Sequence, residues 1–158
     1  MQVRAYRPSD AAACAQIFHQ GVQIGAADAY AQAQRDAWSP HVPRPEAWTK
    51  RLSGLTIWVA EISGGVIGFI AMTPEGLVDF LFVRPDRIGQ GVAAALYETL
   101  EDHARQEQLS ELTTEASHMS KPFFAARGWS VVRANLAMRR GVALDNWIMS
   151  KSLANDQQ

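Results

Sequence analysis

The sequence has little that could cross-link the chain covalently or anchor it in a membrane. Cys14 is the only cysteine in 158 residues, so the chain can form no internal disulfide and no cysteine-based zinc cluster. The first residues lack the apolar run of a signal peptide, and no stretch approaches the roughly 20 apolar residues that a membrane span needs. We therefore expect a cytoplasmic protein with no membrane partner and no metal site.

The chain also lacks an excess of either charge. It carries 15 lysines and arginines against 16 aspartates and glutamates, a formal net charge of −1. Without a basic field there is nothing to hold a nucleic-acid backbone by counterion release, so we predict no nucleic-acid partner. A small anionic ligand needs only a local cluster of donors, and the charge balance leaves that class open.

What is present is ordinary globular composition, with 47% hydrophobic and 20% charged residues. No repeat, low-complexity block or linker divides the chain, and its length suits one domain. We predict a single domain over residues 1–154 and a polar tail over residues 155–158.

Periodicity predicts alternating groups of helices and strands. The expected strands are 3–6, 57–62, 66–72, 77–83, 112–116, 130–138 and 144–150, and the expected helices are 11–25, 26–38, 46–52, 92–108 and 121–127. Short turns join the strands between 57 and 83 into an antiparallel meander, whereas a long helix separates strands 77–83 and 112–116, which favours a parallel pair. The pattern predicts an α/β domain with a mixed, mostly antiparallel sheet of about seven strands and helices on both faces.

A glycine-containing turn follows strand 77–83 and opens the long helix. The first N–H groups of a helix have no partner within it and carry the positive end of the helix dipole. Gly89 and Gly91 would let an anion approach these groups closely. We predict that the segment from Gly89 to Ala94 holds a diphosphate.

Two other phosphate-binding motifs resemble this turn. A P-loop needs Lys and Ser or Thr after the second glycine, and Val92-Ala93 stands there instead. A dinucleotide fingerprint fits Gly89, Gly91 and Ala94, with Glu115 at a suitable distance, but residues 84–88 separate the glycines from the strand. A nucleotide-cofactor enzyme and an ordinary loop stay open as alternatives.

The segment 81–96 resembles the strand-loop-helix signature of the GNAT superfamily of N-acetyltransferases, [Q/R]-x-x-G-x-[G/A], and 122–129 resembles its second signature, a short helix ending in glycine and an aromatic residue. The resemblance covers nearly the whole chain, and Trp38-Ser39-Pro40, Glu115-Ala116-Ser117 and 139–142 are similar to a bacterial, uncharacterised branch. It implies acetyl transfer from acetyl-CoA to a primary amine of a small molecule or peptide, by direct attack in a ternary complex. Dimers are common among such proteins, so the resemblance leaves a homodimer open.

The resemblance also implies where acetyl-CoA binds. The backbone of strand 77–83 would pair with the pantetheine arm as an added strand, and strand 112–116 would splay away to open the slot. An N–H at Phe82 or Val83 would face the oxyanion. The implied cofactor-binding residues are Leu81, Phe82, Val83, Ile88, Gly89, Gln90, Gly91, Val92, Ala93, Ala94, Ser117 and Phe124.

Two positions depart from the family pattern. Ile88 occupies the first signature position, where Gln or Arg is usual, and Arg87 beside it is the candidate substitute. Phe124 stands where many members carry the tyrosine that protonates the departing thiolate. Water, Ser117 or His118 would have to serve, or the thiolate leaves without help. A non-catalytic CoA-binding or sensory module is therefore an alternative.

Three residues are candidates for the base that deprotonates the amine. Asp79 interrupts an apolar strand and, by alternation, shares a face with Leu81 and Val83, although a structural carboxylate would look the same. Glu115 ends the neighbouring strand and could equally form a salt bridge. His118 follows that strand, with an exposed loop histidine as the alternative.

The acceptor side is predicted from aromatic residues ahead of the meander. Tyr30 and Trp38 lie in the region that covers the acceptor in the resembling fold, and His41 lies in the proline-rich loop that follows. Aromatic walls suit an apolar or cationic amine. Core packing for the rings and a solvent-facing position for His41 are the competing interpretations.

Overall fold

Seven strands form one sheet in the computed structural model, which describes residues 1–154; the predicted tail, 155–158, lies outside the described residues. The strands are β1 (Gln2–Ala5), β2 (Thr56–Ile62), β3 (Gly65–Met72), β4 (Leu77–Val83), β5 (Glu111–Ala116), β6 (Ser130–Arg139) and β7 (Val142–Ser152). Their order across the sheet is β1-β2-β3-β4-β5-β7-β6, and every neighbouring pair is antiparallel except β4 and β5. The predicted mixed, mostly antiparallel sheet is confirmed.

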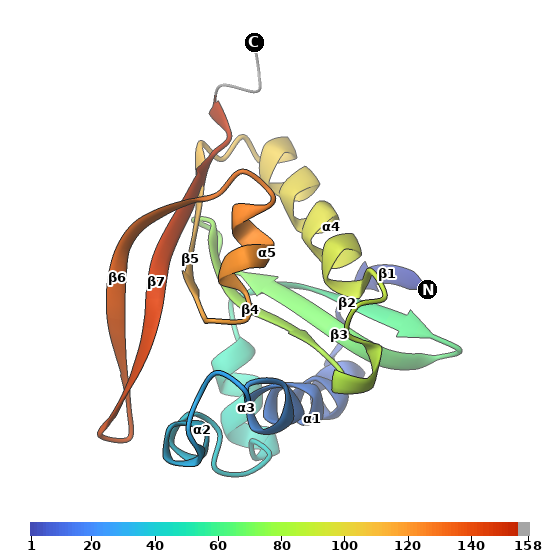
Figure 1. Cartoon of the computed structure of the whole chain (residues 1–158). Coiled ribbons are helices and arrows are strands. Elements are labelled where there is room, and N and C mark those ends of the chain that lie inside the picture. The colour runs from blue at the N-terminus through green and yellow to red at the C-terminus, as the bar shows by residue number, and fades with distance from the viewer. Residues whose placement is uncertain (155–158) are drawn as a thin grey trace.

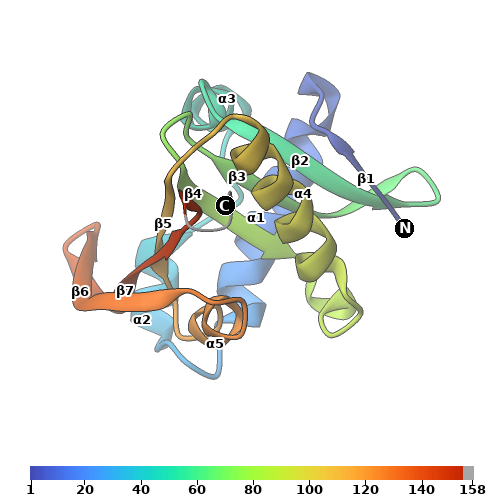
Figure 2. The same ribbon diagram turned by 90° about the horizontal axis from the view of Figure 1, so that it is seen from above.

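Helices cover both faces of the sheet (Figures 1 and 2). They are α1 (Ala11–Gln20), α2 (Gln32–Trp38), α3 (Pro45–Leu52), α4 (Val92–Gln106) and α5 (Lys121–Ala125). The long helix α4 packs on β2, β3 and β4, while α1 and α3 pack against each other, with α1 lying on the other face of β3 and β4. The β6–β7 hairpin extends along one side of the molecule, past α2 (Figure 1).

Strand β3 shows how the sheet divides the core in two. Ile70 and Met72 point into the cluster beneath α4, and Phe69 and Ala71 point into the cluster beneath α1 and α3. All four side chains are at most 1% exposed. Because both faces of β3 are buried, its sequence is a continuous run of apolar residues and does not alternate with polar ones.

The first two helices are shorter than predicted. Helix α1 ends at Gln20 and continues as one wide π turn over Gly21–Gly25, and α2 begins only at Gln32. The backbone N–H of Ala31 bonds the side chain of Gln34 at 2.9 Å, which caps α2 at that point. Ala26 and Tyr30 are buried against Leu144 of β7, so tertiary packing rather than helix propensity sets the segment between them.

A buried ion pair ties the first strand to the first helix. Both guanidinium nitrogens of Arg4 bond the carboxylate of Asp10 at 2.9 Å, and Arg4 Nε bonds Glu61 at 3.0 Å. The hydrogen bonds from Arg4 hold the pKa of Asp10 below its ordinary value. Asp10 directly precedes α1, but its side chain accepts from Arg4 and from the N–H of Arg7 and does not cap the helix.

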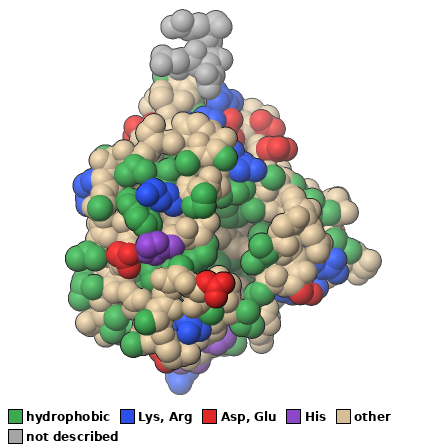
Figure 3. All heavy atoms as spheres, viewed as in Figure 1, with side chains coloured by type: hydrophobic (Ala, Val, Ile, Leu, Met, Phe, Trp, Pro, Cys, Tyr) green, Lys and Arg blue, Asp and Glu red, His purple; other side chains and the backbone are tan. Residues whose placement is uncertain are grey.

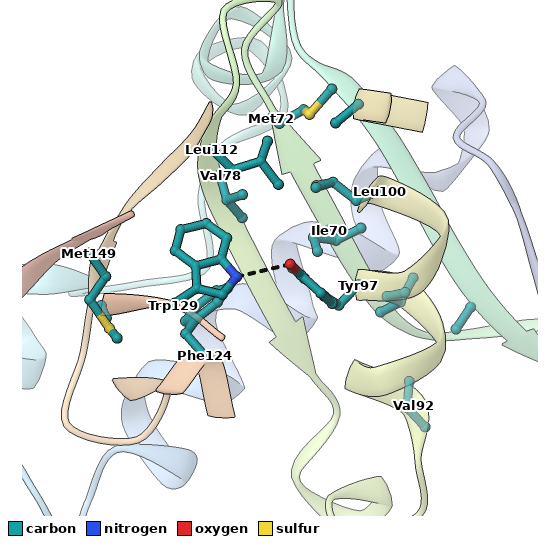
Figure 4. Close-up of a cluster of buried hydrophobic side chains, with 14 of the residues drawn as sticks. Ile70, Met72, Val78, Val92, Tyr97, Leu100, Leu112, Phe124, Trp129 and Met149 are labelled. Atoms are coloured by element: carbon teal, nitrogen blue, oxygen red, sulfur yellow. Dashed lines mark hydrogen bonds between the residues drawn. The ribbon is translucent and has the colours of Figure 1, made fainter. Parts of the chain in front are cut away.

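A second buried network joins α4 to the start of β6. The indole N–H of Trp129 donates to the Tyr97 hydroxyl at 2.9 Å (Figure 4), and that hydroxyl donates to Glu101 at 2.6 Å. Lys151 of β7 bonds the same carboxylate at 2.7 Å. Burial raises the pKa of Tyr97, so it stays a neutral donor. The network fixes the rings that pack against Phe124.

None of the helices in the described part of the chain is long and apolar enough to cross a membrane.

We predict that Tyr97→Phe lowers the free energy of unfolding by about 1–3 kcal/mol, because the Trp129 N–H and Glu101 then lose a buried partner. Urea denaturation measures this as a lower midpoint at an unchanged slope. Tyr6→Phe is the matched control, since the Tyr6 hydroxyl has no hydrogen-bond partner within residues 1–154, and should change stability by less than about 0.5 kcal/mol. Equal effects of the two substitutions would contradict the role of the network.

Candidate active site

The sheet opens where β4 and β5 diverge. Only two residue pairs join these strands, Leu77 with Thr113 and Val78 with Thr114, although each strand continues beyond them. The hydroxyl of Thr114 closes the junction by donating to the carbonyl of Val78 at 2.8 Å. Beyond that point the facing backbone edges are free to pair with another extended chain, as the resemblance implied.

A β-bulge in β4 lies at this junction. Ala71 of β3 pairs with Phe80 and Met72 pairs with Val78, so Asp79 has no partner on β3. A bulge inserts one residue and reverses the alternation of side chains beyond it. Leu81 and Val83 therefore pack on the α4 side, with Val78.

The prediction that Asp79 shares a face with Leu81 and Val83 is wrong, because the bulge reverses the alternation after Asp79. Asp79 turns instead toward α3, where Arg51 bonds its two oxygens at 2.7 and 3.1 Å. Arg51 also lies over the ring of Phe80, 4.6 Å from its centroid. The carboxylate at the bulge is thus an ion-pair partner.

A cavity of about 890 Å³ fills the opening. Its walls come from β4, β5, the start of α4, α5, the inner face of the β6–β7 hairpin, and the segments before β2. Figure 3 shows this face of the molecule hollowed near its centre, with hydrophobic side chains along the walls. The size and the mostly apolar lining suit a small-molecule site.

The predicted anion-binding turn forms one end of the cavity. Gly89 and Gly91 have φ angles of +84° and +81°, a region that other residues rarely adopt, and open space lies where their side chains would be. Gly91 directly precedes α4, so the free N–H groups of the first helical turn lie at the cavity. Gln90 does not line the cavity; its side chain lies 3.5 Å from the carbonyl of Asp86.

Arg87 lies beside this turn. Its side chain lines the cavity, and its Nε is buried without a hydrogen-bond partner among residues 1–154. Ile88 at the signature position is 61% exposed and offers only its backbone for polar contacts. A buried guanidinium nitrogen without a partner is costly in the free protein, and a phosphate oxygen would satisfy it.

Two carboxylates lie at the vertex of the opening, the point where β4 and β5 separate after the pair Val78–Thr114. Asp79 and Glu115 are each the first residue after the last β4–β5 pair, one on each strand. Asp79 is paired with Arg51, whereas Glu115 accepts only from Asn135 at 3.2 Å and Asn146 at 3.5 Å. Within the described residues, Glu115 has no cationic partner, so the predicted alternative of a salt bridge to an arginine does not apply.

His118 is not brought together with these residues. Its Nε2 lies 2.5 Å from a carboxylate oxygen of Asp145, and its ring packs edge-on against Trp147 and Tyr30. The hydrogen bond from His118 lowers the pKa of Asp145. The imidazole does not line the cavity.

Phe124, at the position where many family members carry a tyrosine, belongs to an apolar wall of the cavity. Two serine hydroxyls lie near this wall. Phe124 is 2% exposed and packs with Trp129 and Tyr97, yet it borders the cavity. The hydroxyl oxygens of Ser117 and Ser120 lie 3.1 Å apart, and both residues line the cavity. Both serines lie in the segment that directly precedes α5, the helix that carries Phe124.

The predicted acceptor residues differ in their placement. Trp38 lines the cavity next to Phe82. Tyr30 also lines it, but its hydroxyl donates to the carbonyl of Asp145 at 2.8 Å, and burial raises its pKa. His41 lies outside the main cavity, on a smaller hollow, with its ring nitrogen 2.9 Å from the carbonyl of Val42.

Sequence reasoning missed several cavity residues that fold in from distant segments. They are Arg51, Ser120, Ala137, Arg139, Leu144 and Asn146. The two-residue period of the closing hairpin could have placed its odd-numbered β6 residues on one face. Nothing in the local pattern indicates that this face turns toward β5 and the cavity.

Comparison with known proteins agrees with this architecture. A model of the acetyltransferase (GNAT) domain family matches residues 26–150. The uncharacterized N-acetyltransferase YafP of Escherichia coli K12 is 34% identical over 149 residues, 94% of each chain.

Solved structures agree as well. The crystal structure of a GCN5-related N-acetyltransferase from Rhodopseudomonas palustris superposes with a TM-score of 0.91 at 34% identity, covering 96% of this chain and 95% of that one. The structure of YncA from Salmonella typhimurium, a putative acetyltransferase solved with acetyl-CoA, has a TM-score of 0.72 at 20% identity and covers 97% and 94%. The similarity to YncA, at 20% identity, is a similarity of fold alone.

We predict that Gly91→Glu abolishes coenzyme A binding, because a carboxylate and a strained backbone replace the open turn. At a ligand concentration of 100 times Kd, coenzyme A should stabilise the unchanged protein by about 2.7 kcal/mol in thermal or urea unfolding, and the variant not at all. Gly64→Glu is the control, since Gly64 has a φ of +79° and equal space in the β2–β3 turn. Stabilisation of the Gly91 variant by coenzyme A would refute the site.

We also predict that Arg87→Ala weakens coenzyme A binding by about 10- to 100-fold, the loss of a hydrogen bond to a charged group. Pantetheine, which lacks the diphosphate, should bind both proteins equally in calorimetry. Arg84→Ala is the control, because Arg84 is already paired with Asp86. Equal losses for coenzyme A and pantetheine would show that Arg87 acts on the fold instead.

Proposed function

Because the chain belongs to the GNAT acetyltransferases, a family of acyltransferases, we propose that it moves an acetyl group from acetyl-CoA to a primary amine by direct attack. The observation that carries the proposal is the continuity of one cavity. It runs from the glycine turn at the start of α4 along the free edge of β4 to the carboxylates at the vertex. The acceptor is a small molecule or a peptide, bound on the side of Trp38 and the hairpin.

The cofactor would be held mostly by backbone groups. Free amides between Gly89 and Ala94, with Arg87, would bind the diphosphate. The pantetheine arm would extend along β4 toward the vertex. It would pair with the backbone of this strand as β5 does at Leu77 and Val78. The thioester, at the far end of the arm, would then reach Asp79 and Glu115.

Alternation along β4 indicates which amides face the arm. The N–H of Arg84 donates to Ile67 of β3 at 2.8 Å, so the groups of Phe82 also point toward β3. Those of Leu81 and Val83 point into the opening. We therefore favour Val83 over Phe82 among the predicted oxyanion donors, and add Leu81, which is nearer the vertex.

Glu115 is the base that the geometry favours. An incoming ammonium group would meet its carboxylate, which no cation among residues 1–154 neutralises, and would give up one proton to it directly or through water. The amine nitrogen then attacks the thioester carbon, the tetrahedral intermediate loses the C–S bond, and the nitrogen releases its second proton to water as the amide forms. Asp79, engaged by Arg51, is a positioning residue that holds α3 against the bulge.

The leaving thiolate needs a proton that Phe124 cannot supply. His118 is occupied by Asp145 outside the cavity, so water or the Ser117–Ser120 hydroxyl pair would protonate the sulfur. Phe124 contributes a dry wall beside the sulfur. The same apolar wall suits a module that binds coenzyme A without turnover, which is the competing function.

We predict that Glu115→Gln lowers kcat by about 100-fold or more, because the base is lost while its hydrogen-bonding shape is kept. Thiol release from acetyl-CoA with a panel of primary amines measures this. Coenzyme A should stabilise the variant and the unchanged protein equally.

Asp79→Asn is the matched comparison. It should lower kcat less than Glu115→Gln does, and mainly lower stability by releasing Arg51. The reverse order of effects on kcat would make Asp79 the base. Stabilisation by coenzyme A with no thiol release from any amine would favour the binding module.

A further inference from the structure

Resting on the proposed function, we infer that the acceptor is a small, elongated zwitterion, a primary amine that carries an anionic group at its far end. Glu115 would take the amine and Arg139 the anion. Both side chains line the acceptor half of the cavity, and neither has an oppositely charged partner among residues 1–154.

The other charged groups of the cavity are already engaged or lie elsewhere. Arg51 and Asp79 neutralise each other at 2.7 Å. Arg127 donates to the carbonyl of Phe123 and lies over its ring, 3.7 Å from the centroid. Arg87 lies beside the glycine turn and is assigned to the diphosphate. Glu115 and Arg139 are left for an acceptor, since the Arg139 side chain donates only to the carbonyl of the preceding Met138, at 3.1 Å, within residues 1–154 and packs over no ring there.

Strand register places these two groups at opposite ends of one face. Glu115 pairs with Ile148 of β7, and Arg139 of β6 pairs with Val142 of the same strand. Six residues separate those β7 positions, which is about 20 Å along a strand. The two side chains shorten this span, but the amine and carboxylate of one α-amino acid could not reach both.

The face between Glu115 and Arg139 is polar next to Glu115 and apolar further along the hairpin. Asn146, next to Glu115, bonds its carboxylate weakly at 3.5 Å. Leu144 and Ala137 follow as a cross-strand pair, 5% and 7% exposed, with Trp38 packed beside Leu144. Such a surface suits a methylene chain or another apolar linker between two charged ends.

The hairpin is held in place before any ligand arrives. Arg140 donates to the carbonyl of Ala37 at 2.7 Å, Gln34 to that of Ala143 at 3.1 Å, and Tyr30 to that of Asp145 at 2.8 Å. These bonds join the hairpin to α2 and to the segment before it. A preformed wall binds with less loss of conformational freedom than a loop that must order.

The test compares ω-aminooctanoate with octylamine as acceptors for the full-length protein and acetyl-CoA. We expect kcat/KM to favour the carboxylated amine by about tenfold, through KM. Arg139→Gln should remove that preference by lowering kcat/KM for ω-aminooctanoate to about the octylamine value, and Arg139→Lys should restore part of it. Arg7→Gln is the control for charge, because Arg7 is an exposed arginine that does not line the cavity.

Calorimetric titration of both amines into the protein loaded with coenzyme A provides a readout that needs no turnover. Tighter binding of ω-aminooctanoate, lost in Arg139→Gln and kept in Arg7→Gln, would support the inference even if no acetyl transfer were detected. Equal binding and equal kcat/KM for the two amines would overturn it. Acetylation of both amines without preference would overturn the inference alone, and absence of thiol release with any amine would count against the proposed function.

Discussion

The separation of β4 from β5 after two residue pairs is the constraint on which the rest of the site depends. A regular parallel pair would fill the space between these strands with its own hydrogen bonds. The bulge at Asp79 changes the direction of β4 and reverses its alternation, so the backbone edge of Leu81 and Val83 is left without a partner. Unpaired backbone groups are costly when buried, and a cofactor arm that pairs with them removes the cost.

The same opening creates an asymmetry between two carboxylates. Asp79 and Glu115 stand at equivalent places on the two strands, but their neighbours differ. The bulge directs Asp79 to an arginine of α3, whereas β5 directs Glu115 to two asparagines of the hairpin. A carboxylate held by neutral amides can still accept a proton or bind a cation, and one already joined to a guanidinium is less free to do so. Environment rather than residue type separates the two roles.

The buried hydrogen-bond networks around the cavity hold its walls rigid. Tyr97, Trp129 and Glu101 fix the ring stack behind Phe124, and Tyr30 fixes the hairpin against the segment before α2. Each hydroxyl acts as both donor and acceptor between elements that are far apart in sequence. Hydrogen-bonded hydroxyls thus hold two walls of the cavity, α5 and the β6–β7 hairpin, which favours a preformed shape.

The sequence by itself determined the order of the elements, the antiparallel meander, the parallel crossover and the glycine turn at the start of α4. These depend on local periodicity and on backbone freedom at Gly89 and Gly91, which neighbouring residues specify. It also singled out Asp79 as a carboxylate within an apolar strand and Glu115 near the end of the neighbouring strand.

Only the tertiary structure decided what those carboxylates meet. The bulge in β4 turned Asp79 toward Arg51. Pairing across the β5–β7 and β6–β7 ladders brought Asn146 and Arg139 to the cavity and Asn135 to Glu115. A bulge leaves no mark in the hydrophobic pattern, and contacts between distant segments depend on strand register, which no local stretch of sequence encodes.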